Sequence, residues 1–241
     1  MDVEITPFKR AKFRFIRLVR AVGLLKLADD LRYRLRMIQA RSANRAFLRE
    51  NPDFVPPSEY LAFDAYNFVK WEDYLRTGRR HAHFFARAIC EHCEGEDLQV
   101  LEWGCGPGRI IRHLPELLGE RTTRIVGTDY NAKTIEWCNE AFPGSEFYRN
   151  GLNPPLPFED DTFDAVYNYS VFTHLSKVVQ LAWAMELHRV VKPGGIVIST
   201  THGDRFTYLL SSSQERKTYE EGEAVIQGRY KEGGKWFFSI H

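Results

Sequence analysis

A run of three glycines at alternate positions follows a short apolar segment, and an acidic residue stands two positions before the first glycine. The run reads Glu102-Trp103-Gly104-Cys105-Gly106-Pro107-Gly108-Arg109. Glycine has no Cβ, so a turn of this kind lets backbone N–H groups come close to a ligand. A dinucleotide-binding turn has the spacing G-x-G-x-x-G, whose third glycine would fall at position 109, where this chain has arginine. This difference and the acid at Glu102 favour a cofactor without a pyrophosphate.

The turn resembles the first motif of the class I S-adenosylmethionine (SAM) dependent methyltransferases, (Asp/Glu)-x-Gly-x-Gly-x-Gly. The resemblance covers about residues 74–201 and implies a Rossmann-like domain with SAM as its cofactor. It implies that Glu102 orients the turn and the methionine ammonium group, and that the three glycines let the backbone approach the cofactor. It also implies that the carboxylate of Asp129, which lies 21 residues after Gly108, accepts hydrogen bonds from both ribose hydroxyls.

Further cofactor contacts are implied at the ends of the next strands. Tyr130 would pack on the adenine, and Asn150 stands where the family often has an aspartate that meets the adenine amino group. An amide carbonyl oxygen can accept the same hydrogen bond, so this departure is compatible with binding. The remaining residues of the implied cofactor site are Tyr74, Gly151, Leu152 and Asn168.

Methyl transfer is an in-line displacement at a sulfonium carbon, so the protein must align the acceptor and, for a hydroxyl acceptor, help it lose its proton. His174 and His202 follow the fourth and fifth predicted strands, and histidine has a pKa suited to general-base catalysis. Tyr169, at the end of the fourth strand, is the third candidate catalytic residue. A structural alternative is open, because a histidine at position 174 can also cap the next helix.

The segment Asn153-Pro154-Pro155-Leu156 is spelled like the turn with which nitrogen methyltransferases hold a target amino group. In those enzymes the turn closes the fourth strand, whereas here the segment follows the third strand. The fourth strand ends instead at Tyr167-Asn168-Tyr169-Ser170. We therefore interpret the segment as an extended loop near the adenine edge, and a nucleic-acid substrate loses its main support.

A regular alternation of strands and helices positions these residues. Strands are predicted at residues 100–102, 124–127, 146–149, 163–169 and 196–200, and helices at residues 109–118, 131–142 and 176–191. This alternation indicates a parallel sheet with helices on both faces, whose ligands bind outside the carboxyl ends of the strands. The predicted fold class is α/β: a Rossmann-like three-layer αβα sandwich with a mainly parallel sheet, preceded by an α-helical N-terminal extension.

The beginning of the chain is basic. The first 50 residues hold 13 Lys/Arg against 5 Asp/Glu, whereas the other residues hold 20 against 27. Apolar residues and arginines at helical spacing predict an amphipathic helix over residues 8–27 and a second helix after Asp29 and Asp30. Two interpretations are open: a helix that lies on an anionic membrane, or a helical cap that packs on the core or on a second copy in a homodimer. The acidic remainder of the chain argues against nucleic acid as a partner.

We divide the chain into a basic helical arm at residues 1–50, a linker with a helical cap at 51–79, and a SAM-binding domain at 80–241. The prolines within the linker predict extended backbone, because each disfavours helix at the residue before it. Two helices are predicted in residues 60–93, with a break at Gly78.

The last part of the chain predicts a hairpin. Residues 223–230 and 235–240 alternate in polarity around Glu232-Gly233-Gly234. The pair either completes the methyltransferase sheet or is an insertion, and the apolar end of the sequence leaves a C-terminal truncation open.

Composition limits the remaining function classes. A chain of 241 residues, 44% hydrophobic and with a net charge of +1, is long enough for one α/β domain and an appendage. The longest uncharged stretch of the basic arm, residues 21–25, is too short for a signal segment or a spanning helix. Cys90 and Cys93 lack the second ligand pair of a zinc site, and we expect no metal. We expect a cytoplasmic protein, membrane-peripheral if the arm binds lipid.

These patterns favour a SAM-dependent methyltransferase that acts on a small-molecule or lipid- or sugar-linked acceptor at oxygen. Two functions of other classes are open. An NAD(P)-dependent oxidoreductase is disfavoured by the glycine spacing, and a non-catalytic interaction protein with a SAM-type fold would be tethered by its basic arm.

Overall fold

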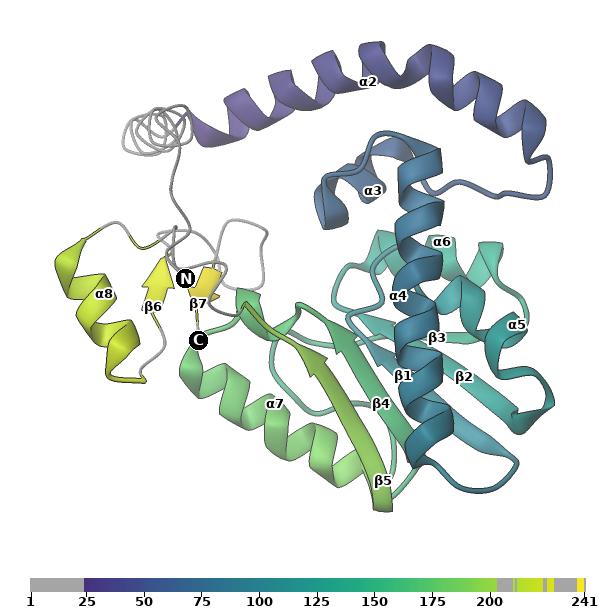
Figure 1. Ribbon diagram of the computed structural model, residues 1–241, viewed down its shortest axis with the longest axis vertical. Coiled ribbons are helices and arrows are strands. Elements are labelled where there is room, and N and C mark those ends of the chain that lie inside the picture. The colour runs from purple at the N-terminus through teal and green to yellow at the C-terminus, as the bar shows by residue number, and fades with distance from the viewer. Residues whose placement is uncertain (1–23, 203–209, 211, 223–224, 228–237, 241) are drawn as a thin grey trace.

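The computed structural model describes residues 24–202, 210, 212–222, 225–227 and 238–240. Its centre is a five-stranded parallel sheet with the strand order β3-β2-β1-β4-β5 (Figure 1). The strands are β1 (Leu98–Trp103), β2 (Thr122–Asp129), β3 (Glu146–Arg149), β4 (Phe163–Tyr169) and β5 (Val191–Thr200). The predicted α/β class, the parallel sheet and the positions of all five strands are confirmed.

The sheet has a topological switch point beside β1. The chain runs outward from β1 to β2 and β3, then crosses back to place β4 on the other side of β1. In the observed register, Glu102 of β1 lies between Gly127 of β2 and Tyr167 of β4. Ligands of open parallel sheets bind outside the carboxyl ends of the strands at such a point. The turn after β1 and Asp129 at the end of β2 are therefore at the edge where a ligand is expected.

Helices cover both faces of the sheet (Figure 1). One face carries α4 (Trp71–His92), α5 (Leu114–Leu118) and α6 (Ala132–Ala141), and the other carries α7 (Lys177–Val190). Side chains of β1 point to both faces of the sheet. Leu98 and Val100 belong to the apolar cluster under α4, and Leu101 and Trp103 belong to the cluster under α7. The three-layer sandwich is thus built on alternating side chains of buried strands.

Two further helices, α2 (Leu25–Glu50) and α3 (Glu59–Tyr66), form a cap together with the start of α4. Figure 1 shows α2 arching over α3 and over the end of α4 that lies nearest to the cap. The side chain of Asn44 fastens α2: its Nδ2 donates to the Val69 carbonyl (2.8 Å), and its Oδ1 accepts from the Trp71 N–H (3.0 Å). No helix in the described part of the chain is both long enough and apolar enough to cross a membrane.

The start of α2 differs from the prediction. The predicted helix at residues 8–27 lies almost wholly outside the described residues, and the second helix does not begin after Asp29 and Asp30 but at Leu25. The Asp29 carboxylate lies inside the helix and accepts a hydrogen bond from Arg32 Nη2 at 2.6 Å. Asp29 therefore stabilises the helix through an ion pair with Arg32, three residues further along, and does not cap the end of the helix.

The predicted break at Gly78 is also wrong. The break lies earlier, at Asn67, which has a left-handed conformation (φ 58°) and ends α3, whereas α4 continues through Gly78. A Cβ at Gly78 would overlap the carbonyl oxygen of Arg109. Gly78 is therefore present because the chain after the glycine turn packs directly on the helix backbone, and the boundary drawn at residues 79 and 80 falls within α4.

Two smaller regions differ in detail. The helix predicted over residues 109–118 is a 3₁₀ turn, η1 (Ile111–His113), followed by the short α5. The pairing of the predicted hairpin is confirmed, since β6 (Val225–Gln227) and β7 (Phe238–Ile240) are antiparallel. They form a separate two-stranded sheet and do not extend the five-stranded one, and the unpredicted α8 (Ser213–Glu220) precedes them. The turn predicted at residues 232–234 lies outside the described residues.

We expect Gly78→Ala to destabilise the protein. An alanine inside an exposed helix usually stabilises it by up to about 1 kcal/mol, but here the methyl group has no room and overpacking costs about 1–3 kcal/mol. Chemical denaturation would measure the change in the free energy of unfolding. Gly144→Ala is the matched control, since nothing lies within 4 Å of a Cβ placed there. Equal stabilities of the two variants would contradict the close contact between α4 and Arg109.

Candidate functional site

The glycine turn after β1 is held by the neighbouring strand. The N–H groups of Gly104 and Cys105 donate to the Thr128 carbonyl (2.7 and 2.9 Å). Gly104, Gly106 and Gly108 have φ values of 75°, 50° and 70°, a region that only glycine adopts readily. Side chains at these positions would also overlap Val171, Tyr66 and Phe142. The turn is therefore specific for glycine for reasons of both conformation and packing.

Asp129 joins the end of β2 to this turn. Its Oδ2 accepts from the Gly106 N–H at 3.0 Å, and its Oδ1 accepts from the Asn131 N–H at 2.8 Å. Burial raises the pKa of Asp129 to about 6, although these hydrogen bonds favour the ionised form. A carboxylate has about four acceptor positions, so each oxygen can accept one more hydrogen bond. Asp129 can therefore bind two donors of a ligand at once.

Glu102 lies behind the turn and has almost no solvent exposure. Its Oε2 accepts a hydrogen bond from the Tyr167 hydroxyl at 2.8 Å. Burial raises the pKa of Glu102 to about 8, because the protein interior solvates the charged form poorly. The side chain also has a hydrogen bond with the backbone at Ile111, just after the turn, and it does not line the cavity described next.

A cavity of about 520 Å³ opens above the turn, at the carboxyl ends of the strands. The sheet supplies its floor, and α3 and α4 supply the facing wall. Of the residues predicted for the site, those that line the cavity are Gly104, Gly106, Asp129, Tyr130, Asn150, Gly151, Leu152, Tyr169, His174 and His202. The structure thus brings seven of the eleven candidate cofactor residues and the three candidate catalytic residues to one cavity.

Comparison with known proteins identifies the domain that contains this cavity. The family model described as a methyltransferase domain matches residues 101–199, which include the second half of β1, all of β2 to β4, most of β5, the glycine turn and Asp129. This domain belongs to the class I SAM-dependent methyltransferases.

Individual relatives agree with this assignment. A probable SAM-dependent methyltransferase of Mycolicibacterium smegmatis is 32% identical over 123 residues, or 51% of this chain and 44% of that protein. The sterol 24-C-methyltransferase erg6 of Schizosaccharomyces pombe is 29% identical over 140 residues, or 56% of this chain and 35% of that protein. The chain therefore spans less than half the length of either relative.

Among solved structures, the chain is similar to one from the complex between the Haloferax volcanii Trm112 methyltransferase activator and the putative methyltransferase. The two chains share 18% sequence identity, and the superposition has a TM-score of 0.48. It covers 72% of this chain and 80% of that one.

The residues of the methyltransferase domain fit SAM. Asn150 donates through Nδ2 to the Gly151 carbonyl (2.6 Å), but its buried Oδ1 has no hydrogen-bond partner among the described residues. A buried acceptor without a donor is costly, and an adenine amino group would supply that donor. Asp129 would provide acceptors for the ribose hydroxyls, and Gly104 and Gly106 line the same cavity. Bound SAM would supply an electrophilic methyl group.

Four predicted residues do not line the cavity. Glu102 and Gly108 lie within or behind the turn. Tyr74 was expected to cover the cofactor, but it is buried beneath the turn, where its hydroxyl donates to the Pro107 carbonyl at 2.6 Å. Asn168 donates through Nδ2 to Ser199 Oγ of the neighbouring strand (2.6 Å). These four positions support the floor of the cavity.

The sequence analysis missed the wall supplied by the cap. The residues concerned include Asp64, Tyr66, Phe68, Thr77, Arg80 and His81. A signal was present, because Tyr74, Thr77 and His81 recur at helical spacing on one side of α4. Tyr74 packs under the turn, and the other two continue this side toward the cavity.

The imidazole of His81, which lies in this wall, has a defined protonation state. Its ring stacks on Tyr169 with the centroids 4.4 Å apart, and its Nδ1 lies 3.0 Å from Arg109 Nη1. Burial, with the charges of Arg109 and Arg80, lowers the pKa of His81 to about 4. Arginine can only donate, so Nδ1 is the acceptor and the imidazole is neutral at pH 7. His81 thereby fixes the ring of Tyr169, a candidate catalytic residue.

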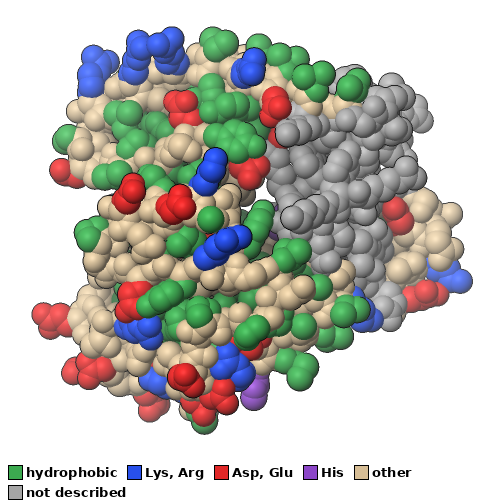
Figure 2. Space-filling model, turned by 180° about the vertical axis from the view of Figure 1, so that it is seen from behind, with side chains coloured by type: hydrophobic (Ala, Val, Ile, Leu, Met, Phe, Trp, Pro, Cys, Tyr) green, Lys and Arg blue, Asp and Glu red, His purple; other side chains and the backbone are tan. Residues whose placement is uncertain are grey.

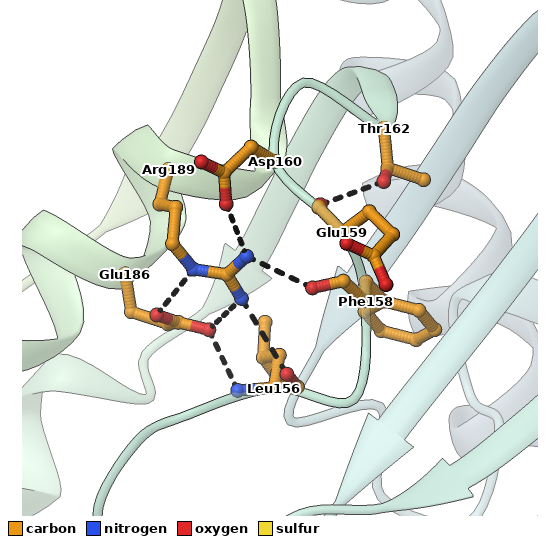
Figure 3. Close-up of polar contacts among 7 residues, drawn as sticks. All are labelled: Leu156, Phe158, Glu159, Asp160, Thr162, Glu186 and Arg189. Atoms are coloured by element: carbon orange, nitrogen blue, oxygen red, sulfur yellow. Dashed lines mark hydrogen bonds and ion pairs between the residues drawn. The ribbon is translucent and has the colours of Figure 1, made fainter.

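The loop between β3 and β4 is fastened to α7. Glu186 accepts from the Leu156 N–H (2.6 Å) and from Arg189 Nη2 (2.6 Å), while Arg189 Nη1 donates to Asp160 Oδ1 (2.7 Å). Figure 3 shows the Arg189 guanidinium lying between these two carboxylates and the loop backbone. The loop is therefore held at several points along its length.

The structure confirms that the Asn153-Pro154-Pro155-Leu156 segment is a loop after the third strand and does not close the fourth. The segment follows β3, whereas the carboxyl end of β4 is Tyr169. The Trp183 indole donates to the Leu152 carbonyl (2.9 Å), so the same loop presents Leu152 at the rim of the cavity.

The raised pKa of Glu102 predicts that the stability of the fold depends on pH. Its folded-state pKa of about 8 lies above the ordinary value of 4.5. The stabilisation from burying the neutral acid is therefore complete below pH 4.5 and is lost as the pH rises to about 8. We expect Glu102→Gln to remove from the ligand-free protein a slope of up to about 1.4 kcal/mol per pH unit in the free energy of unfolding. Denaturant titrations across this range measure the slope.

The exposed Glu116→Gln variant is the control for loss of one carboxylate, and its slope should match that of the wild type. An unchanged slope in Glu102→Gln would show that Glu102 is ionised throughout the range.

Proposed function

We propose that this protein is a SAM-dependent methyltransferase that transfers a methyl group to oxygen of a small-molecule or lipid- or sugar-linked acceptor. The observation that carries the proposal is the Asp129 carboxylate, fixed by two backbone N–H groups at the floor of a cavity bounded by the glycine turn. A nucleoside sugar with two adjacent hydroxyls matches its remaining acceptor positions.

The proposed choice of oxygen rests on the groups that line the same cavity. Tyr169, His174 and His202 lie at or just after the ends of β4 and β5, and a neutral imidazole or a tyrosinate can take a proton from an acceptor hydroxyl. A hydroxyl is a weak nucleophile until a base removes its proton, so a methyltransferase for such an acceptor needs one of these groups. The neutral His81 would keep the Tyr169 ring in a fixed position while this happens.

A lipid-linked acceptor is supported by the names of two relatives. One is the sterol 24-C-methyltransferase of Schizosaccharomyces pombe. The other is a phthiotriol/phenolphthiotriol dimycocerosates methyltransferase of Mycobacterium ulcerans, 32% identical over 127 residues. An enzyme that acts on such an acceptor gains from contact with the membrane that holds it. We therefore propose a cytoplasmic, membrane-peripheral protein that contacts anionic lipid.

The outer face of α2 has the chemistry for this contact. Leu27, Leu31, Leu35 and Ile38 recur every three or four residues, and each is more than half exposed. Arginines continue the same side toward the end of the helix, namely Arg34, Arg41, Arg45 and Arg49. Figure 2 shows Lys and Arg side chains gathered along the top of the molecule, over α2. Apolar side chains flanked by cations are typical of helices that lie in the headgroup layer of an anionic membrane.

The inner face of α2 is occupied, so the outer face is available. Asn44 has hydrogen bonds with Val69, which lies between α3 and α4, and with Trp71, the first residue of α4. The ring of Tyr33 packs on the rings of Tyr60 and Phe63, with centroids 5.7 and 5.1 Å apart. Because α3 also lines the cavity, a membrane bound to α2 would lie near the wall through which a lipid-linked acceptor enters. A second copy of the chain is the alternative occupant of the outer face.

We expect the purified protein to bind S-adenosylhomocysteine (SAH), the product form of the cofactor, and Asp129→Ala to weaken this binding by at least about 10-fold. Hydrogen bonds to a charged group contribute about 1.5–3 kcal/mol, and a factor of ten is 1.4 kcal/mol. Titration calorimetry with SAM, SAH and NADH measures the affinities, with the exposed Asp53→Ala as control. NADH binding without SAM or SAH binding would favour an oxidoreductase. SAM binding without transfer of label to any screened acceptor would favour an interaction protein.

We expect the double variant Leu35→Gln/Ile38→Gln to bind anionic vesicles at least about 10-fold more weakly, because full burial of even one such side chain contributes about 1.5–3 kcal/mol and a factor of ten is 1.4 kcal/mol. Sedimentation with phosphatidylserine-containing vesicles measures the bound fraction. The matched control is Val178→Gln/Met185→Gln, which removes two exposed apolar side chains of α7. Unchanged vesicle binding, combined with a shift from dimer to monomer in analytical ultracentrifugation, would assign the outer face of α2 to a homodimer.

A further inference from the structure

Arg109 is a buried cation in the wall of the cavity. Its relative exposure is 2%, yet it lines the cavity. Its Nη1 lies 3.0 Å from His81 Nδ1 and 3.5 Å from Thr77 Oγ1, both neutral groups. Its Nε has no hydrogen-bond partner among the described residues. A guanidinium has five N–H donors, so most of its hydrogen-bonding capacity is unused.

Aromatic rings surround the guanidinium but do not neutralise it. Its carbon lies 4.5 Å from the ring centroid of Tyr66, 5.0 Å from that of Tyr169 and 5.9 Å from that of Phe68. Such cation–π contacts are worth about 0.5–2 kcal/mol each, whereas a buried charge without a counter-ion costs several kcal/mol. The three aromatic rings thus hold the guanidinium of Arg109 in place, and its positive charge remains able to pair with an anion.

No carboxylate among the described residues forms an ion pair with Arg109. The two buried acids nearby have other partners, since Asp129 accepts from backbone N–H groups and Glu102 accepts from Tyr167. With its pKa raised to about 8, Glu102 is largely neutral at pH 7 and does not balance the arginine. The partner that Arg109 lacks in the protein is therefore an anion.

The backbone of Arg109 is fixed as firmly as its side chain. The close approach of its carbonyl oxygen to Gly78 anchors it against α4. From the same helix, Arg80 adds a second cation to the cavity lining. A guanidinium whose position is set in advance loses little entropy when it binds a planar two-oxygen group.

We propose that Arg109 is the binding site for a carboxylate of a ligand in this cavity. The inference rests on the proposed function and adds to it the identity of one recognised group. Two sources can present that group: the amino-acid end of the cofactor, or an acidic acceptor. The fork of Arg109 would bind either through two parallel N–H···O bonds, with Arg80 adding to the local positive charge.

The experiment compares ligands with and without the carboxylate in the wild type, Arg109→Gln and Arg109→Lys. Calorimetry is run with SAH and with 5′-methylthioadenosine, which has the same nucleoside but no amino-acid end. If the cofactor supplies the carboxylate, Arg109→Gln binds SAH about 10- to 100-fold more weakly and binds methylthioadenosine unchanged. Arg109→Lys should lose less, because it keeps the charge but not the fork. Arg79→Gln, a surface arginine paired with Glu116, is the charge-matched control.

If the acceptor supplies the carboxylate, SAH and methylthioadenosine bind the Arg109→Gln variant as they bind the wild type. Octanoate then binds the SAH-saturated wild type at least about 10-fold more tightly than the variant, while the uncharged octanol does not distinguish them. Equal affinities of wild type and variant for both SAH and octanoate overturn the inference. Thermal unfolding identifies variants that have lost the fold, and Arg109→Lys carries the comparison if Arg109→Gln does not fold. A wild type that binds neither SAH nor methylthioadenosine overturns the proposed function itself.

Discussion

The hydrogen bond from the Gly106 N–H to the Asp129 carboxylate ties together the parts on which the site depends. It joins the turn after β1 to the end of β2, and it can form only because the parallel register brings these two strand ends side by side. The left-handed backbone of the turn aims the N–H group at the acid. A side chain at Gly106 would displace Tyr66, so the same turn also determines how closely the cap approaches. Sheet, turn and cap are therefore interdependent.

The cap belongs to the site as fully as the sheet does. The Tyr66 hydroxyl donates to the Cys105 carbonyl (2.9 Å) and the Tyr74 hydroxyl donates to the Pro107 carbonyl (2.6 Å), so two helices of the cap grip alternate carbonyls of the turn. Each hydroxyl reaches the turn from a cluster of aromatic side chains, which includes Trp71 and Phe54. The position of the floor and that of the wall are thus set by one group of contacts.

Sequence periodicity and motif order were enough to locate the central sheet, the glycine turn and most of the cavity floor. Buried strands bounded by glycine, proline and asparagine leave a clear pattern, and the resemblance to the methyltransferase motifs then singles out Asp129 at the end of such a strand. The cap wall was missed because its residues, such as His81, meet the site only through tertiary packing. The helix break predicted at Gly78 was wrong for the same reason. In the sequence, a glycine that allows a neighbouring backbone to pack closely on a helix cannot be told from a glycine that ends the helix. Tyr74 was expected in a helix that ends before Gly78 and over the cofactor, whereas it lies in α4 and is buried beneath the turn.

The sheet ends on one side at β5, a strand of ten residues for which no partner on its outer edge is present among the described residues. A free edge offers a row of unpaired N–H and C=O groups that any extended peptide can continue. Val197, which is exposed in the middle of this strand, adds an apolar contact for such a peptide. Among the described residues, this edge is therefore a place where another chain can add a strand, and how the edge is covered affects the tendency of the protein to aggregate.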